Sequence, residues 1–360
     1  MNLFNKDKKS ALEAKELAQF IAFGPVVFQV ARIMRNAGVL TVIEDAGKKG
    51  LTHQEILRAV KLPDYGLRVL LESSLGIGLV IINDDRYAIT KTGHFILHDP
   101  LTRINMDFIH DVNYKGLFHL DKSIENGKPE GLKELGNWNT IYEGLSQLPK
   151  HIQDSWFAFD HFFSDNSFPA VLPMVYNKPI TKLMDIGGNT GKWAIASTLH
   201  DHDVHITIVD LPGQVTMAKS KIIELGLAER VSFFPVNLLD KQQPLPTGYD
   251  AIWMSQFLDC FSEAEITSIV ERCHDAIEPG GTMFILEAFW DRQRFEAAAF
   301  CLQQTSIYFT ALANGNSQMY DSRIFIEAVK AGGFEIYEEI DGIGLSHTLL
   351  KCRKKAEKVD

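Results

Sequence analysis

The segment LMDIGGNTG at residues 183–191, with the segment ITIVD at residues 206–210, decides the fold. The first is an apolar strand that runs into a glycine-rich turn, and the second is an apolar strand that ends on an acid, Asp210. A strand, a glycine-rich turn, a helix and an acid-ended strand form the layout of a nucleotide-binding βαβ unit. Glycines let a ligand lie against the main chain, and the acid can accept hydrogen bonds from both ribose hydroxyls. These segments predict an adenosine-containing ligand.

The order of residues in the loop separates the adenosine ligands. A dinucleotide fingerprint reads GxGxxG, and a P-loop carries Lys-Ser or Lys-Thr after its last glycine. Here the order is DxGGNxG followed by Lys192 and Trp193, so neither phosphate-binding pattern fits. Asp185, two residues before the first glycine, suits a ligand with a positive end, and both the amino group and the sulfonium of S-adenosylmethionine are cationic. The alternative is an ordinary glycine turn between a strand and a helix.

Strands and helices alternate through the rest of the C-terminal half. The predicted strands are 231–234, 249–254 and 282–287, and the predicted helices are 215–225 and 263–277, the last broken by EPGG at 278–281. This alternation predicts an α/β fold with a mostly parallel sheet, whose ligands sit beyond the carboxyl ends of the strands. Polar residues fall at or just past those ends: Asp185, Asp210, Asn237, Asp259 and Glu287.

With these motifs the chain resembles the class I S-adenosylmethionine-dependent O-methyltransferases that act on plant phenolics and bacterial polyketides. The resemblance extends over nearly the whole chain and is strongest in residues 185–191, VDLP at 209–212, YDAI at 249–252 and EPGG at 278–281. It implies a Rossmann-like methyltransferase sheet with helices on both faces and an enzyme of secondary metabolism. It also implies three parts: a mostly α winged-helix dimerisation domain (1–100), a helical connector to the substrate pocket (101–175) and the cofactor-binding catalytic domain (176–360).

The resemblance assigns the cofactor contacts to the glycine loop and the strand ends. The implied contacts are Asp185, Gly187, Gly188, Asn189, Gly191, Asp210, Leu211, Asn237, Leu238, Ser255 and Gln256. Many relatives have Asp where this chain has Asn237, whose amide oxygen can still accept from the adenine amino group. Ser255 stands where relatives often carry Lys, so one cofactor contact is lost or replaced.

The catalytic segment departs from the family pattern. Relatives read Leu-His-Asp-Trp after the fourth strand, and the His removes the substrate proton, whereas this chain reads LDCF at 258–261. Asp259 occupies the position of the base and Glu287 matches an acid that flanks the His, but a second flanking acid is unmatched at 315–320. We expect Asp259 and Glu287 to meet at one rim of the pocket, where like charges raise the pKa of at least one acid. The competing hypothesis is that Asp259 only binds the acceptor and that proximity drives transfer.

Aromatic residues in the connector and in the helix after the fifth strand suggest the acceptor pocket. By the family layout the helix 152–163 covers the cofactor and faces the substrate. The candidate pocket residues are Phe157, His161, Phe162, Trp290, Phe300, Gln303, Gln304, Ile307 and Tyr308. An apolar pocket with few polar groups suits a planar aromatic or polyketide-like molecule.

The N-terminal hundred residues have the pattern of a winged helix-turn-helix. The expected elements are helices at 53–60 and 65–75 and a hairpin of strands 79–82 and 86–89. The presumed recognition helix, 64–74, carries only Arg68 as a basic residue, and the net charge is -10. Both observations argue against nucleic acid as a partner. In the resembling family this unit forms the dimer interface, so we expect a homodimer.

Composition favours a cytoplasmic enzyme. The four cysteines have no CxxC spacing, and His200, His202 and His205 lie in a connection far from the ligand edge, so no metal site is predicted. The apolar segment 20–30 is short and is broken by Gly24 and Pro25, so no membrane partner is predicted.

Three functional hypotheses follow. The first is an S-adenosylmethionine-dependent O-methyltransferase acting on a hydroxyl of a small aromatic or polyketide-like molecule. The second is a protein of the same fold with a different or lost reaction, because Asp259 replaces the family's His. The third is a winged-helix transcriptional regulator, which the acidic charge disfavours.

Overall fold

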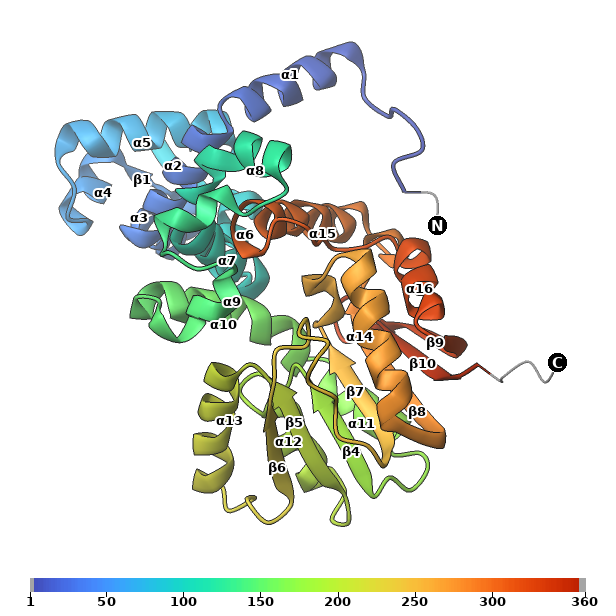
Figure 1. The fold of residues 1–360 in the computed structure, drawn as a ribbon. Helices are drawn as coiled ribbons and strands as arrows, with labels where there is room; N and C mark the ends of the chain where they lie inside the picture. The colour runs from blue at the N-terminus through green and yellow to red at the C-terminus, as the bar shows by residue number, and fades with distance from the viewer. Residues whose placement is uncertain (1–2, 356–360) are drawn as a thin grey trace. The chain divides into compact units, whose positions relative to one another are not determined.

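The computed structural model describes residues 3–355 and divides into two compact units (Figure 1). One unit runs from Asn5 to His110, and the other comprises the rest of the described chain. This division falls ten residues after the boundary expected at 100/101, and the three-part organisation predicted from the sequence stays a prediction. Each unit is described by itself.

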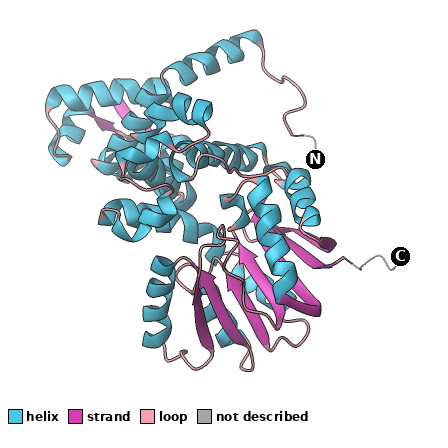
Figure 2. Cartoon of the chain, in the orientation of Figure 1, coloured by secondary structure: helices cyan, strands magenta, loops and turns pink. Residues whose placement is uncertain are grey.

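The N-terminal unit is mostly helical (Figure 2). Its helices are α1 (Ala11–Ala22), α2 (Gly24–Asn36), α3 (Val39–Asp45), α4 (His53–Ala59), α5 (Asp64–Ile77), α6 (Lys91–His98) and α7 (Pro100–Phe108). Its strands are β1 (Leu51–Thr52), β2 (Val80–Asn83) and β3 (Arg86–Ile89), which form an antiparallel sheet in the order β1-β3-β2. Thr52 caps the start of α4 and forms a capping box with Glu55. The unit therefore contains the helices and the hairpin expected for it.

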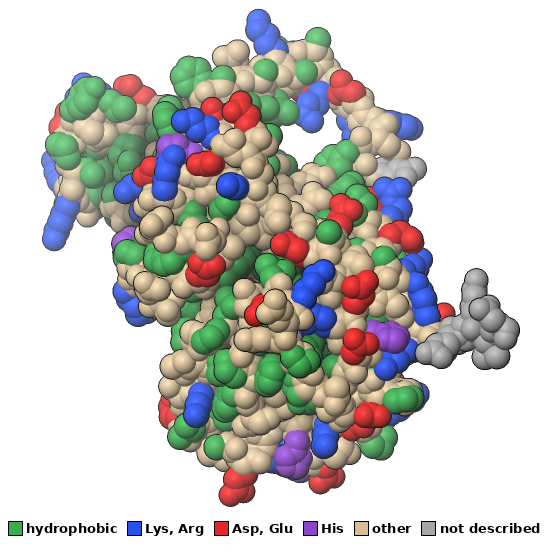
Figure 3. Space-filling view, in the orientation of Figure 1, with side chains coloured by type: hydrophobic (Ala, Val, Ile, Leu, Met, Phe, Trp, Pro, Cys, Tyr) green, Lys and Arg blue, Asp and Glu red, His purple; other side chains and the backbone are tan. Residues whose placement is uncertain are grey.

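Apolar side chains form a core in this unit but also reach its surface. Met34, Leu40 and Leu67 are fully buried, whereas α1 has no buried residue at all. Figure 3 shows hydrophobic side chains gathered on the face of this unit around α4 and α5. Within residues 3–355, no single helix is long and apolar enough to cross a membrane, and only α1 and α2 together, bent by 72°, reach that length and composition.

The C-terminal unit is built on a seven-stranded sheet in the order β6-β5-β4-β7-β8-β10-β9. The strands are β4 (Lys182–Ile186), β5 (His205–Asp210), β6 (Val231–Pro235), β7 (Tyr249–Ser255), β8 (Ile277–Ala288), β9 (Phe334–Ile343) and β10 (His347–Lys354). The five strands from β6 to β8 are parallel, and β10 pairs antiparallel with both β8 and β9. The predicted mostly parallel sheet is confirmed, and its carboxyl ends meet at one edge.

Helices cover both faces of this sheet. The α-helices of this unit are α8 (Leu120–Asn126), α9 (Ile141–Gly144), α10 (Lys150–Asp165), α11 (Phe168–Val175), α12 (Lys192–His200), α13 (Pro212–Glu224), α14 (Glu263–Ala276), α15 (Glu296–Tyr308) and α16 (Ser322–Ala331). Of these, α11, α12 and α13 cover one face of the sheet, and α14 and α16 cover the other. Because side chains alternate along β7, Ile252 packs with α14 and α16 in one core, and Trp253 packs with α11, α12 and α13 in the other. The sheet therefore lies between two apolar cores, one on each of its faces.

One local prediction is wrong. The EPGG segment at 278–281 was expected to separate a helix from the fifth strand, but it lies inside β8, which begins at Ile277. Tyr249 of β7 pairs with Ile277 and Ala251 pairs with Thr282, so the segment is extra chain in an irregular ladder. Gly280 has φ +86°, a conformation that glycine adopts readily, and this lets the strand continue past the irregularity.

Candidate active site

The glycine loop between β4 and α12 is packed too tightly for side chains. Gly187 has φ +73°, and a Cβ there would lie 2.2 Å from the ring of Phe257. A Cβ on Gly188 would lie 2.8 Å from Asp185 Oδ2. Gly191, at φ +80°, precedes the first residue of α12. Glycine therefore keeps the main chain bare where the sequence predicts a ligand.

Asp210 ties the end of β5 to this loop. Its carboxylate accepts hydrogen bonds from the backbone N–H of Asn189 at 2.8 Å and of Leu211 at 2.7 Å. Burial raises the pKa of Asp210 to about 6 although both hydrogen bonds oppose that shift. Burial, with the charge of Asp210 as a smaller cause, raises the pKa of Asp185 well above its ordinary value. Within residues 3–355 neither acid pairs with a Lys, Arg or His side chain, so both suit a positively charged ligand.

Several buried polar atoms in this loop region lack a partner within the described residues. They are Asp185 Oδ2, Asn189 Oδ1, Ser255 Oγ and Gln256 Oε1. Each can accept a hydrogen bond, and leaving such a group buried and unpaired costs about 1–3 kcal/mol. All four residues line one small pocket with Gly187 and Gly188. The set fits S-adenosylmethionine, since its ammonium group would supply both the donors and the positive charge.

A larger pocket shares walls with the small one. Gly187, Asn189 and Gln256 line both. The larger pocket also contains Asp210, Leu211, Asn237 and Leu238, the predicted adenosine contacts, together with Asp259. Ten of the eleven predicted cofactor residues line one pocket or the other, and Gly191 lines neither. The fold therefore brings the predicted cofactor contacts and the candidate base to one continuous hollow.

Asp259 and Glu287 lie close together, but only Asp259 lines the pocket. Asp259 sits in a single helical turn, Leu258–Cys260, after β7, and Glu287 lies near the end of β8. Glu287 Oε1 accepts from the backbone N–H of Phe257 at 3.0 Å and of Leu258 at 2.9 Å. Glu287 thus holds the turn that carries Asp259, a role that the sequence pattern alone did not suggest.

Burial raises the pKa of Asp259 to about 7. Burial also raises the pKa of Glu287, and the charge of Asp259 raises it further. Asp259 is only 5% exposed and Glu287 only 1%. This is the direction that the sequence analysis expected for two acids sharing an apolar site. A carboxyl group with a pKa near neutrality can hold or release a proton at physiological pH.

Aromatic and polar groups surround Asp259 on the pocket side. The indole Nε1 of Trp156 donates to Tyr308 Oη at 2.8 Å, and the side-chain amide of Asn314 donates to the carbonyl of Cys260. Burial raises the pKa of Tyr142, with smaller contributions from Cys260, Tyr308 and Asp259. The side chains beside Asp259 therefore include the aromatic rings of Trp156, Tyr308 and Tyr142.

The structure places only two of the nine predicted acceptor residues on these pockets: Tyr308 on the larger and His161 on the smaller. The other seven line neither pocket and stay predictions: Phe157, Phe162, Trp290, Phe300, Gln303, Gln304 and Ile307. From α10 the pocket receives Trp156, Phe159 and Asp160 instead. Their i, i+3, i+4 spacing places them on one helix face, but aromatic residues also occupy positions 157, 162 and 163, so the sequence does not single out this face.

Comparison with known proteins finds a family match in each of the two units. A Dimerisation2-like domain matches residues 15–87 and an O-methyltransferase domain matches residues 167–335. The chain is similar to an L-tyrosine C(3)-methyltransferase of Streptomyces lavendulae, 23% identical over 339 residues that cover 92% of this chain and 90% of that protein.

Two solved structures share the fold. One is an S-adenosylmethionine-dependent methyltransferase in its apo form, with a TM-score of 0.70, 22% identity and coverage of 94% of this chain and 99% of that chain. The other is an O-methyltransferase from neocarzinostatin biosynthesis in complex with S-adenosylmethionine and 2-hydroxy-5-methyl naphthoic acid. It has a TM-score of 0.68, 18% identity and coverage of 97% of this chain and 100% of that chain.

Proposed function

Since the chain belongs to the S-adenosylmethionine-dependent O-methyltransferase family, we propose that it methylates the hydroxyl of a small aromatic or polyketide-like acceptor, with Asp259 as the base. Its cofactor is S-adenosylmethionine. The observation that supports this acceptor chemistry is a buried carboxyl group with a raised pKa, set among aromatic walls in the same hollow as the adenosine contacts. The relatives reported above lend no support to a lost reaction or to a regulator.

Asp259 would act by taking the proton of the acceptor hydroxyl. A phenol with a pKa near ~10 attacks poorly until its proton leaves, and a carboxylate with an ordinary pKa of ~3.9 is a weak base. Burial raises the pKa of Asp259 to about 7, which is much closer to the pKa of the phenol. Glu287 would keep the turn in place through its two backbone hydrogen bonds. When bound, the cofactor would supply an electrophilic methyl group on its sulfonium.

Methyl transfer to carbon is a second candidate. It is favoured by the similarity to a tyrosine C(3)-methyltransferase over 92% of the chain. A phenolate is nucleophilic at its ortho carbon as well as at oxygen, so proton removal by Asp259 would serve both reactions.

Incubation of the full chain with labelled S-adenosylmethionine and a panel of phenols tests the function. The product distinguishes the two reactions, because a C-methylated phenol still titrates near pH ~10 and an O-methylated one does not.

We expect the ligand-free protein to lose stability as the pH rises from about 4 to 7. Asp210 and Asp259 have folded-state pKa values of about 6 and about 7, above the ordinary ~3.9 of the unfolded chain. A raised folded-state pKa means that the stability contribution is complete below the unfolded value and is lost through the folded one. The melting temperature, measured at closely spaced pH values, should therefore fall over this window.

Added S-adenosylmethionine should raise the melting temperature more at pH 8 than at pH 5.5, because its cationic groups then meet ionised carboxylates. Asp210→Asn with Asp259→Asn should flatten the pH dependence of the ligand-free protein. Equal slopes for this variant and the unsubstituted chain would contradict the assignment.

We also infer a homodimer through the N-terminal unit, which carries the dimerisation-domain match. Helix α1 has no buried residue, and Ile21 is 71% exposed and Phe23 59% exposed. A second copy of this chain is the simplest partner that would bury such an exposed apolar surface. Light scattering should give twice the chain mass, and Ile21→Glu with Phe23→Glu should give the monomer mass. Leu199→Glu, at a residue 65% exposed in the other unit, serves as control. A monodisperse monomer of the unsubstituted chain would contradict the inference.

A further inference from the structure

The charged side chains described at the larger pocket are all acidic. Its acidic lining residues are Glu143, Asp160, Asp210, Asp259 and Glu265. Among the described residues that line it there is no Lys, Arg or His. Proteins usually bind carboxylate ligands through Arg or Lys, whose charge-assisted hydrogen bonds offset the loss of water. The pocket offers no such partner to an anion.

Neutral groups hold the acids at the acceptor end. Glu265 accepts from the backbone N–H of Ser262 at 2.9 Å, from its hydroxyl at 2.7 Å and from the amide of Asn316 at 3.3 Å. Glu143 accepts from the backbone N–H of Asn139 at 3.2 Å. Neither glutamate forms an ion pair within the described chain, so both keep their negative charge unneutralised beside the hollow.

From this charge arrangement we propose that the acceptor is an aromatic phenol without a free carboxylate, such as an ester, an amide or an amine. The proposal rests on the proposed methyl transfer and narrows its substrate class. An acid would place its charge near several carboxylates with no basic side chain among the described lining residues to pair with. An ester would not, and an ammonium group would be attracted. The acceptor would therefore differ from the naphthoic acid bound in the structural neighbour.

A matched set of acceptors tests the proposal. Tyramine, 3-(4-hydroxyphenyl)propanoic acid and the methyl ester of that acid share one ring and differ in charge. We expect kcat/KM at neutral pH to be at least about tenfold higher for the ester and the amine than for the acid, the equivalent of about 1.4 kcal/mol. If the acid is used as well as the ester, the proposal is overturned while methyl transfer stands.

A charge reversal adds an independent check. Glu143→Lys supplies the missing cation at the pocket and should raise kcat/KM for the acid relative to the ester. Glu125→Lys makes the same change of net charge at an exposed residue of α8 outside the pocket and should not. If none of the three compounds is methylated, the methyl-transfer proposal fails for this phenol class. In that case, the binding of each of the three compounds to the protein saturated with S-adenosylhomocysteine is measured by calorimetry. If all three bind equally, or none binds, the proposed charge preference of the acceptor site is overturned.

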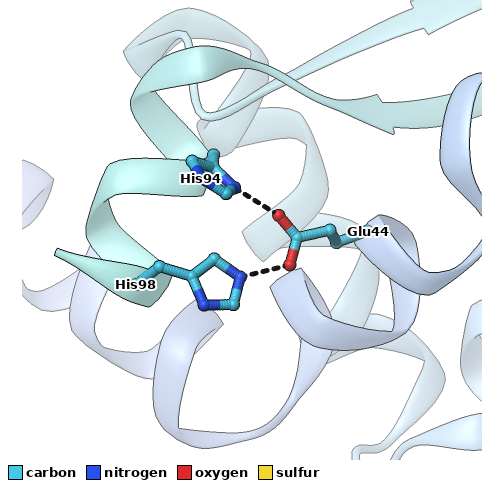
Figure 4. Close-up of side chains that lie close together, drawn as sticks. All are labelled: Glu44, His94 and His98. Atoms are coloured by element: carbon cyan, nitrogen blue, oxygen red, sulfur yellow. Dashed lines mark hydrogen bonds and ion pairs between the residues drawn. The ribbon is translucent and has the colours of Figure 1, made fainter.

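A different observation concerns the N-terminal unit, where Glu44 of α3 faces His94 and His98 of α6 (Figure 4). The two histidines are four residues apart and share one face of α6. Glu44 Oε1 lies 2.6 Å from His94 Nδ1, and Glu44 Oε2 contacts His98 Nε2. One donor atom from each of the three side chains lies within 4.8 Å of the other two.

The geometry points to a site for a divalent transition-metal ion, with Zn²⁺ as the best match. Two imidazoles and one carboxylate form a ligand set that zinc takes in proteins, with a fourth position left for water. The sequence analysis predicted no metal site, because it considered only cysteine spacing and the histidines of 200–205.

Titration of chelator-treated full chain with Zn²⁺ alone tests this site by calorimetry. We expect one Zn²⁺ per chain, with affinity lowered at least about tenfold in His94→Ala and in His98→Ala. His119→Ala is the control, because His119 pairs with a single acid, Glu134, at 2.9 Å. No binding by the unsubstituted chain, or binding that survives both substitutions, overturns the proposal.

Discussion

Replacement of Asp259 by Asn is expected to lower kcat by about 10² to 10⁴, the range that a general base contributes. The amide is nearly the same size and can still hydrogen-bond the acceptor, but it cannot take the proton. Asp259 is the acid that lines the pocket at the end of β7, and burial has moved its pKa to about 7. Single-turnover rates with an acceptor from the phenol panel would measure the loss directly.

The pH profile separates a base from a positioning role. With the unsubstituted enzyme, the rate should fall on the acid side as Asp259 becomes protonated, and the variant should lack that limb. Glu125→Gln is the control, because Glu125 is an exposed residue of α8 outside the pocket. A rise confined to KM, with kcat preserved, would show that Asp259 only binds the acceptor.

Replacement of Asp210 by Ala is expected to weaken binding of S-adenosylmethionine and S-adenosylhomocysteine at least tenfold. Two charge-assisted hydrogen bonds to the ribose, each worth about 1.5 to 3 kcal/mol, would be lost. Asp210 also holds Asn189 and Leu211 through their backbone N–H groups, so the loop itself would loosen. Calorimetry gives the affinities, and circular dichroism checks that the fold is intact.

The sheet provides a control for the structural part of this effect. Asp250 accepts hydrogen bonds from the backbone N–H groups of Thr181 and Lys182, both at 2.9 Å, at the start of β4 and therefore at the opposite edge from the ligand. Asp250→Ala removes a carboxylate with two backbone hydrogen bonds, as Asp210→Ala does. We expect cofactor affinity to be unchanged in Asp250→Ala. Equal losses in the two variants would remove Asp210 from the cofactor site.

The sequence alone determined the five parallel strands and their ligand edge, whereas the antiparallel strands β9 and β10 were not predicted. The glycine loop at 185–191 and the acid at Asp210 are read from neighbouring residues, because turn sterics and strand periodicity act over a few positions. Ten predicted cofactor residues accordingly line the two pockets. The departure at Asp259 was also visible, since it depends only on which residue follows the fourth strand.

The tertiary structure alone decided which face of α10 meets the pocket. Aromatic residues occur at 156, 157, 159, 162 and 163, on all sides of that helix, so the sequence has no single apolar stripe to show its rotation. The sequence analysis chose Phe157 and Phe162, whereas Trp156 and Phe159 line the hollow. Packing against segments far away in the chain, including Tyr308, sets that rotation.

The electrostatics of the site were likewise decided by the fold. Whether Asp259 is an ordinary surface acid or a base near pH 7 depends on how much water it loses, and that depends on β7, β8 and the aromatic walls together. The same is true of Glu287, whose hydrogen bonds to the turn at 257–258 join residues 29 and 30 positions apart. Local sequence specifies turns and periodicity, because these depend on steric contacts between neighbours. Burial and pKa arise from long-range packing, which no short stretch of sequence contains.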